Sequence, residues 1–267
     1  MTIHVVGAGG MLGQDIVRAA RGDVVALTRA DLDVTDADAA REALAGSTVI
    51  NCAAHSDVDG AESDPDRAHA VNAEGARNVA QAAERVIYIS TDYVFAGSKH
   101  EPYVESDPLD PLSAYGASKA AGELATAEAN ANHLIIRSSW LFGRGGRNFV
   151  ATMLALARGR EDELRVVDDQ VGCPTFTGHL AEALLPLAAS DQLGILHVAG
   201  ASSCSWFEFA REILDRAGIE AELQPCSTEQ FPRPARRPAY SVLGSERGGP
   251  ALPAWQDGLD AYLGVPA

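Results

Sequence analysis

A glycine-rich turn between a short strand and a helix is the feature that most constrains the fold of this chain. A strand is predicted over 3–6, glycines follow at Gly7, Gly10 and Gly13, and a helix is predicted over 11–20. Glycines at this spacing permit a tight turn, a close approach of backbone to a pyrophosphate, and close packing of helix on strand. The start of the helix offers unpaired N–H groups and a positive dipole end to phosphates. The segment predicts a dinucleotide-binding crossover, with a glycine-rich turn that holds no ligand as the alternative.

Strand-like and helix-like segments then alternate along the first half of the chain. Runs rich in β-branched residues predict strands at 24–27, 49–52, 86–89 and 134–137. Ala-rich amphipathic stretches between them predict helices at 36–44, 66–83 and 115–129. Strands joined by helical crossovers form a parallel sheet with helices on both faces. We therefore expect an α/β protein with a Rossmann-type, doubly wound parallel sheet.

The pattern loosens after residue 151, where a smaller C-terminal α/β lobe is predicted. The later segments indicate loops over 168–175 and 231–238, a strand near 195–200 and a helix over 206–217. We expect residues 1–150 to form the NAD(P)-binding Rossmann domain, joined by the strand near 195–200. Residues 151–267 are expected to form mainly the substrate-binding lobe, with a boundary that is not sharp and two parts that can interleave.

Charge and residue spacing argue against several classes of partner. The chain has 37 acidic and 21 basic residues, a formal charge of −16, and such a surface repels nucleic acid and anionic lipid. No stretch approaches the roughly 18 apolar residues of a membrane span, and no signal-peptide pattern opens the sequence, so we expect a cytoplasmic protein. The seven histidines and four cysteines show no metal-site spacing, so no metal ligand is predicted.

Tyr115 and Lys119 carry the most informative chemistry in the chain. They are four residues apart on a predicted helix, so both side chains lie on one face. We expect the ammonium to lower the pKa of the phenol, which can then protonate a carbonyl oxygen as a hydride reaches the carbon. The alternative is an ordinary surface contact, worth roughly 0.3 kcal/mol.

Two hydroxyl residues, Ser90 and Thr91, end the fourth predicted strand. The carboxyl ends of the strands face the ligand crevice in such a sheet. A hydroxyl at this point can orient the same carbonyl oxygen and stabilise its developing charge. The residues themselves leave the choice between Ser90 and Thr91 open.

The end of the second predicted strand points to NADPH. An NAD-specific site carries an acidic residue about twenty residues after the glycine motif, whereas Thr28 and Arg29 stand here. An arginine suits the 2′-phosphate of NADP. Because of Arg29, NADPH is the expected cofactor. Asp31 and Asp33 follow closely and suit NAD, so NADH is the alternative.

The chain resembles the extended short-chain dehydrogenase/reductases and, among them, the family of dTDP-4-dehydrorhamnose reductases. The most specific similarities are Ser-Thr-Asp-Tyr-Val-Phe at 90–95 and Asp-Gln-Val-Gly-Cys-Pro-Thr at 169–175. Further similar segments lie at 51–54, 70–75, 111–119, 137–143 and 237–243. The resemblance implies NAD(P)H-dependent reduction of the 4-keto group of dTDP-4-dehydro-β-L-rhamnose to dTDP-L-rhamnose, with a nucleotide sugar as the partner.

The resemblance also implies roles for individual residues. Tyr115 becomes the proton donor, Lys119 its partner and a ligand of the nicotinamide ribose, and Thr91 rather than Ser90 the orienting hydroxyl. The expected cofactor-binding residues are Gly7, Gly10, Met11, Leu12, Gly13, Arg29, Asp33, Val34, Ala53, Ala54 and Lys119. The expected substrate-binding residues are Ser56, Val58, Asp92, Tyr93 and Trp140.

Several alternatives stay open at this stage. A 4-ketoreductase or an epimerase for another nucleotide deoxysugar shares the fold and the Tyr–Lys pair. A non-catalytic, NADP-binding regulatory subunit shares the fold but does not need that pair. His55 and Ser56 depart from the residues common in the family, near the expected sugar pocket, so the identity of the sugar is open.

One basic cluster stands out in this acidic chain. Arg233, Arg236 and Arg237 lie in a Pro-rich segment, where guanidinium groups suit a nucleotide-sugar diphosphate. A solvated loop with some ion pairs is the alternative. The protein is expected to be a monomer or a homodimer. Mg²⁺ is known at dimer interfaces among members of the family, but nothing in this sequence indicates it.

Overall fold

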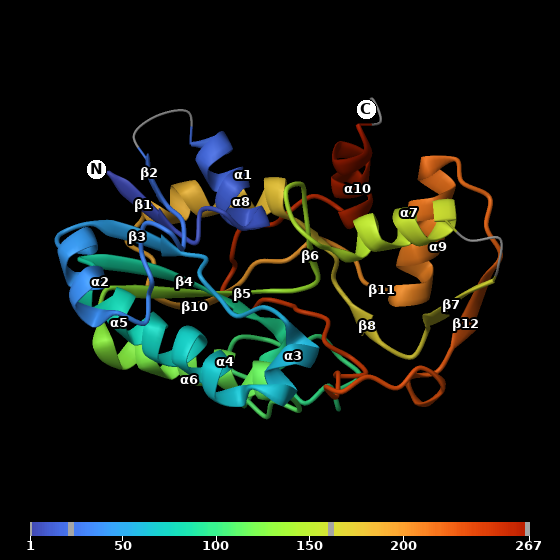
Figure 1. The fold of residues 1–267 in the computed structure, drawn as a ribbon, viewed down its shortest axis with the longest axis horizontal. Helices are drawn as coiled ribbons and strands as arrows, with labels where there is room; N and C mark the ends of the chain where they lie inside the picture. Colours follow the sequence, from blue (N-terminus) through green and yellow to red (C-terminus); the bar gives the residue numbers. More distant parts are fainter. Residues whose placement is uncertain (1, 21–23, 160–162, 265–267) are drawn as a thin grey trace.

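A six-stranded parallel sheet forms the centre of the computed structural model, which describes residues 2–20, 24–159 and 163–264 (Figure 1). The strands lie in the order β10-β5-β4-β3-β1-β2 and pair in parallel. Their bounds are β1 Ile3–Val6, β2 Val24–Leu27, β3 Thr48–Asn51, β4 Arg85–Thr91, β5 His133–Ser138 and β10 Gly194–His197. The predicted Rossmann-type, doubly wound sheet is confirmed, and the strand expected near 195–200 pairs with β5.

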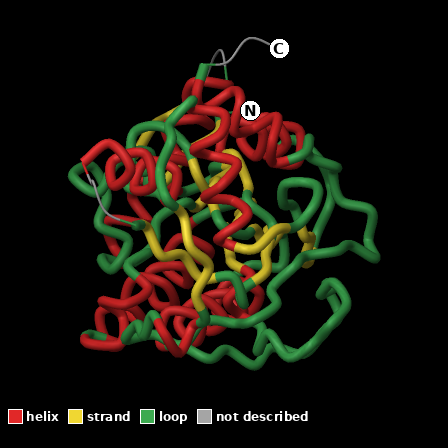
Figure 2. The backbone as a smooth tube through the Cα atoms, turned by 90° about the vertical axis from the view of Figure 1, so that its right-hand side faces the viewer, coloured by secondary structure: helices red, strands yellow, loops and turns green. Residues whose placement is uncertain are grey.

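Helices cover both faces of the sheet, and Figure 2 shows the strands as a layer with helices above and below. Val5 belongs to the core under α1 and α8, and its neighbour Val6 to the core under α2 and α5, because successive strand residues point to opposite faces. The α6 helix lies beside α5 on that second face. The bounds are α1 Met11–Ala19, α8 Thr177–Ala188, α2 Ala37–Leu44, α5 Gly75–Ala82 and α6 Ala114–Ala129.

The strand order reverses between β1 and β3. The chain leaves β1 to form β2 on one side and returns to form β3 on the other. Open α/β sheets bind ligands at the carboxyl ends of the strands at such a reversal. Gly7 follows β1 there and meets the backbone of Cys52 and Ala53, which follow β3.

The later part of the chain forms a second group of small elements, on the right of Figure 1. Three two-stranded sheets pair β6 with β9, β7 with β12 and β8 with β11. Phe142, Phe209 and Trp255 lie in its core. The bounds are β6 Leu141–Phe142, β7 Leu164–Val167, β8 Val171–Gly172, β9 Thr175–Phe176, β11 Cys204–Ser205, β12 Leu223–Cys226, α7 Phe149–Gly159, α9 Trp206–Ala217 and α10 Trp255–Leu263.

The helix predicted over 66–83 is present as α4 Pro65–His69 and α5 Gly75–Ala82, but a π-helical turn over Ala70–Glu74 joins them and breaks the regular α-helical winding. The short helix α3 Val58–Ser63 precedes α4. Asn72 in the π-helical turn accepts a hydrogen bond from the His55 backbone N–H at 2.8 Å and donates to Ser118 Oγ at 2.9 Å. The turn therefore ties the loop after β3 to α6, a tertiary contact that no local pattern indicates.

The segment 168–175 is also more ordered than the predicted loop, because β8 and the start of β9 lie within it. No helix in the described ranges 2–20, 24–159 and 163–264 is long and apolar enough to cross a membrane.

Candidate active site

A cavity of about 400 Å³ opens at the carboxyl ends of β1, β3 and β4. The glycine turn, the end of β2, the loop after β3 and the α6 face line it, together with Leu141 and Thr177 from the later part of the chain. Every residue expected to bind the cofactor lies on its wall, namely Gly7, Gly10, Met11, Leu12, Gly13, Arg29, Asp33, Val34, Ala53, Ala54 and Lys119.

The glycine turn has the shape of a phosphate cradle. Gly7 has φ +79°, and a Cβ atom there would lie 2.6 Å from the Ala53 backbone nitrogen. A Cβ atom on Gly13 would lie 2.5 Å from the Gly7 carbonyl oxygen. The α1 helix begins after Gly10, whose position adds no side-chain cap, so the first-turn N–H groups remain available to a ligand. These observations fit the pyrophosphate of a dinucleotide.

Two arginines line the cavity near the end of β2. Arg29 was predicted to lie here, whereas Arg67 on α4 was missed, because a single arginine in a polar helix gives no signal. Within the described part of the chain, neither guanidinium takes part in an ion pair.

Asp31 and Asp33, which follow Arg29, accept hydrogen bonds from residues of the same turns. Asp31 accepts from the Thr28 hydroxyl at 2.6 Å, and Asp33 accepts from the Thr35 hydroxyl at 2.8 Å. Hydrogen bonds to Thr28 and Thr35 lower the pKa values of the two carboxyls. Asp33 still lines the cavity as a second ionised group beside Arg29.

Tyr115 and Lys119 lie on the same cavity wall, as expected from their spacing. The Lys119 ammonium is buried, donates to the Ile89 carbonyl oxygen at 2.6 Å and lies 3.9 Å from the centre of the Tyr88 ring. Burial lowers the pKa of Lys119 to about 7, against an opposing effect of Glu123.

The expected lowering of the Tyr115 pKa is not found in this ligand-free structure. Burial raises the pKa of Tyr115 to about 12, and a hydrogen bond with Thr91 opposes that rise. The reason is geometric: the Lys119 ammonium is bonded to the Ile89 carbonyl and covers the Tyr88 ring. Tyr115 is therefore a protonated phenol at neutral pH, which is the form that donates a proton.

Ser90 and Thr91 have different partners. The Ser90 hydroxyl lies on the cavity wall but donates to Glu123 Oε1 at 2.5 Å. The Thr91 hydroxyl donates to Asp92 Oδ1 at 3.1 Å and accepts from the Tyr93 backbone N–H at 3.2 Å. It also opposes the rise in the Tyr115 pKa, so Thr91 is the hydroxyl of the two that acts on Tyr115.

The neighbouring aromatic and acidic side chains surround Tyr115. The Tyr93 ring stands edge-on to the Tyr115 ring with centroids 6.1 Å apart. Asp92 is buried and accepts from the Ser241 hydroxyl at 2.5 Å, and burial raises the pKa of Asp92 to about 7. Arg237 hydrogen-bonds with Tyr93, so part of the late loop reaches this side of the site.

The three arginines of that loop have separate surroundings. Arg237 donates to both carboxylate oxygens of Asp59 at 3.0 and 3.1 Å, and Arg233 pairs with Asp59 at 3.2 Å. Arg236 is exposed. Arg237 is therefore the guanidinium of the cluster that acts on Tyr93.

The other expected substrate residues are more scattered. Ser56 lines the cavity, whereas Val58 at the start of α3 and Trp140 do not belong to its wall. Trp140 has φ +46° and stacks on Trp206 with ring centroids 3.5 Å apart. Its Nε1 is buried and has no hydrogen-bond partner in the described part of the chain. Among those same residues, no group of three or more His, Cys, Asp or Glu side chains is placed to hold a metal ion.

The chain matches the family described as RmlD substrate binding domain over residues 1–265. It is 44% identical to a dTDP-4-dehydrorhamnose reductase of Mycolicibacterium smegmatis, over 98% of this chain and 85% of that protein. It is 41% identical to a Streptomyces antibioticus protein named "Probable dTDP-4,6-dihydroxy-2-methyloxan-3-one 4-ketoreductase", over 91% and 86% of the two chains. A crystal structure of dTDP-4-dehydrorhamnose reductase from Bacillus anthracis in complex with NADP superimposes with a TM-score of 0.93 at 37% identity, covering 98% and 99% of the two chains.

Proposed function

This chain belongs to the RmlD substrate binding domain family, and we propose that it reduces the 4-keto group of dTDP-4-dehydro-β-L-rhamnose with NADPH, giving dTDP-L-rhamnose. One observation carries the proposal. Tyr115 and Lys119 face a cavity that begins at the glycine turn, and Thr91 lies close enough to Tyr115 to influence its pKa. The relatives named for this activity support the choice of sugar.

The chain's own groups have complementary tasks in this reaction. NADPH supplies the hydride to the carbonyl carbon when it is bound. Tyr115, protonated at neutral pH, gives its hydroxyl proton to the carbonyl oxygen, and Thr91 orients that oxygen by a hydrogen bond. Lys119 supplies a buried positive charge beside the site and a ligand for the nicotinamide ribose.

The cofactor proposal rests on the cavity wall and on one relative. The glycine turn fits the pyrophosphate, Asp33 and Val34 lie at the adenosine end, and Ala53 and Ala54 follow β3. Arg29 is a guanidinium free to meet a 2′-phosphate, and the relative from Bacillus anthracis was crystallised with NADP.

We place the sugar nucleotide between the cavity and the later part of the chain. Tyr93 offers a ring and a hydroxyl beside Tyr115, and Ser56 offers a polar group on the cavity wall. Asp92 is proposed as a further polar neighbour of the sugar, although its carboxylate is buried and bonded to Ser241 and Thr91. Val58 and Trp140 are proposed as its apolar neighbours. Residues 1–150 with β10 then hold the cofactor, and residues 151–267 contribute mainly to the sugar side. Arg237 remains the best placed guanidinium for the diphosphate.

A 4-ketoreductase that acts on another dTDP-deoxysugar is the second candidate. It is favoured by the 41% identity to the Streptomyces antibioticus protein, which is nearly as high as the identity to the first relative. The two candidates share the proton donor and the cofactor and differ only in the sugar.

The test is the loss of NADPH absorbance with dTDP-4-dehydro-L-rhamnose, with the product identified by mass spectrometry and NMR. Stoichiometric oxidation and formation of dTDP-L-rhamnose support the proposal. Bound NADPH without turnover, together with turnover of another 4-keto sugar, supports the second candidate. An NADPH-binding protein inactive on every keto sugar would overturn both.

A further inference from the structure

A line of three ionisable side chains follows one face of α6. Tyr115, Lys119 and Glu123 are spaced by four residues, which places them one above another along the helix. Tyr115 and Lys119 line the cavity, whereas Glu123 lies one turn deeper and is only 2% exposed. The proposed reaction uses the first two and leaves Glu123 without a task.

Two donors from neighbouring strands bind the side chain of Glu123. Arg137 on β5 donates from Nη2 to Oε2 at 2.7 Å and from Nε to Oε1 at 3.0 Å. Ser90 on β4 donates to Oε1 at 2.5 Å. Glu123 and Arg137 thus form a buried, charge-assisted ion pair.

Arg137 is itself held in place. Its Nη1 donates to the Glu105 carbonyl oxygen at 3.2 Å, its guanidinium lies 5.1 Å from the centre of the Phe95 ring, and His197 Nε2 lies 3.3 Å from Nη1. The carboxylate of Glu123 therefore has a rigid cationic support on the side of β5.

Lys119 faces a small set of titratable groups. From α6 these are Tyr115 and Glu123, from β4 Tyr88, and from the loop after β3 Cys52. Burial raises the pKa of Cys52 to about 12 and keeps Tyr88 and Tyr115 protonated. Glu123 is thus the one carboxylate acting on Lys119 among the described residues, and it faces Arg137, Ser90 and Tyr88 in turn.

We propose that Glu123 is a positioning residue whose carboxylate, fixed by Arg137 and Ser90, keeps Lys119 in its ammonium form at the cavity wall. Burial alone drives Lys119 toward the neutral amine, and Glu123 opposes that effect. The proposal rests on the proposed function only in assigning Lys119 to the reductase reaction. The effect of Glu123 on the protonation of Lys119 does not depend on the reaction and can be measured on the protein alone.

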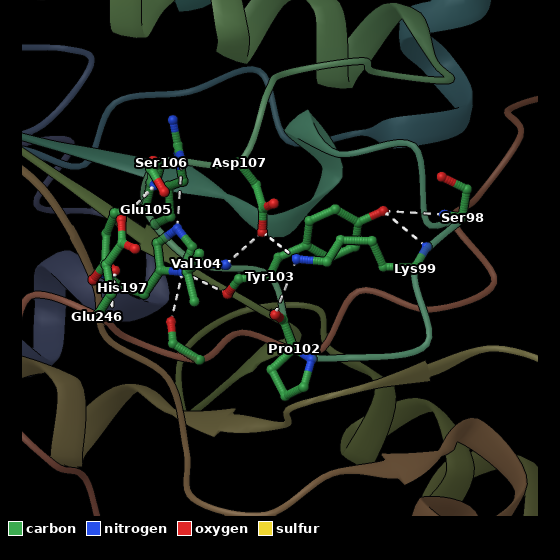
Figure 3. Close-up of polar contacts among 12 residues, drawn as sticks. Ser98, Lys99, Pro102, Tyr103, Val104, Glu105, Ser106, Asp107, His197 and Glu246 are labelled. Carbon is green, nitrogen blue, oxygen red and sulfur yellow. Dashed lines mark hydrogen bonds and ion pairs between the residues drawn. The ribbon is translucent and has the colours of Figure 1, made fainter.

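The composition of the chain allows a direct test. Lys99 and Lys119 are its only lysines, so a protein grown with isotope-labelled lysine gives two side-chain signals in NMR. Lys99 pairs with Asp107 at 2.5 Å rather than with Glu123, and it serves as an internal reference (Figure 3). The Lys99→Arg variant assigns the two signals.

We follow both lysine side-chain signals in an NMR pH titration. In Glu123→Gln we expect the titration midpoint of Lys119 to fall by about one pH unit or more, while that of Lys99 stays unchanged. Glu105→Gln is the matched control, because Glu105 is also buried but bonds to His197 and Glu246 (Figure 3). It should leave the Lys119 midpoint in place. An unchanged Lys119 midpoint in Glu123→Gln, or an equal fall in Glu105→Gln, overturns the proposal.

Glu123→Gln leaves Arg137 buried without its partner and can fail to fold. Two further variants keep the test decisive. Glu123→Asp retains the charge, so its Lys119 midpoint should stay nearer to that of the natural protein. Glu123→Gln combined with Arg137→Met removes the buried pair as a unit, and its Lys119 midpoint should still be lower than in the natural protein. A midpoint equal to the natural one in this double variant contradicts the proposal.

Activity then links Glu123 to catalysis. The alkaline limb of the kcat profile should move to lower pH in Glu123→Gln and stay in Glu105→Gln, so that kcat drops about tenfold at mildly alkaline pH. A loss of folded protein would instead lower kcat by the same factor at every pH. If the natural protein does not reduce the keto sugar, the proposed function fails, while the lysine NMR still decides the role of Glu123.

Discussion

The two walls of the cavity are built on opposite principles. The wall formed by the turn after β1 consists of backbone, and the positions of Gly7 and Gly13 leave no space for a Cβ atom. The wall formed by α6 consists of side chains, the buried Lys119 and the half-buried Tyr115, with the buried Glu123 one turn behind them. The first wall depends on the absence of side chains at its glycines. The second wall depends on charged side chains that are buried.

This difference indicates how a substitution or a change of pH would disrupt each wall. A backbone wall fails by steric conflict, which is independent of pH. A wall of buried charges fails when a proton moves, because burial has brought the pKa of Lys119 and that of Asp92 to about 7. The mutations below separate the two kinds of failure.

The largest effect is expected for Tyr115→Phe. The change removes the hydroxyl that we propose as the proton donor and keeps the ring beside Tyr93, so kcat should fall by about a thousandfold. Binding of NADPH, measured by fluorescence titration, should change little because the glycine turn is untouched. A variant that keeps most of its kcat would remove Tyr115 from the mechanism.

Gly13→Ala should break the backbone wall. Its Cβ would lie 2.5 Å from the Gly7 carbonyl oxygen, and we expect the free energy of unfolding to fall by about 3 kcal/mol, at every pH. Gly9→Ala is the matched control in the same turn, since its nearest contact would be Thr28 Cγ2 at 3.9 Å. Equal denaturation midpoints for the two variants would contradict the steric account.

Asp92 should make the stability of the charged side of the site depend on pH. Burial raises its pKa to about 7, above the roughly 3.9 of an unfolded carboxyl. Between these values the folded protein retains a proton that the unfolded chain has lost, so the free energy of unfolding falls as pH rises. We expect Asp92 to contribute about 4 kcal/mol to that fall.

Denaturant titrations of the natural protein and of Asp92→Asn across this range measure the contribution. The variant should show the shallower decline toward neutral pH, whereas Asp110→Asn, which changes an exposed carboxyl, should follow the natural protein. Parallel curves for all three proteins would mean that Asp92 does not titrate in this window.

Local patterns predicted the backbone wall completely and the charged wall only in part. The glycine spacing acts within a single turn, so each expected cradle residue lies on the cavity wall. The spacing of Tyr115 and Lys119 likewise predicted their shared face. Their pKa values depend on burial and on Ile89 and Tyr88 across the fold, which the spacing does not contain.

The remaining differences have the same origin. The choice between Ser90 and Thr91 is made by Glu123 and Tyr115, which lie on another element. The π-helical turn at Asn72 is stabilised by contacts to His55 and Ser118 far along the chain. The periodicity of apolar residues indicates which face of one helix or strand is buried. It does not indicate contacts between residues of separate segments.

The smallest effect is expected at the adenosine end, where the backbone wall meets Arg29 and Arg67. If either guanidinium binds the 2′-phosphate, its change to Gln should raise the Kd of NADPH about tenfold and leave that of NADH unchanged, because only NADPH carries the extra phosphate. Arg77→Gln, which removes a surface partner of Glu128, is the control and should change neither Kd. A loss of affinity for both cofactors would place the arginine at the shared pyrophosphate or ribose instead. Selectivity would then have to come from Asp33, which lies on the same wall and suits the ribose of NADH.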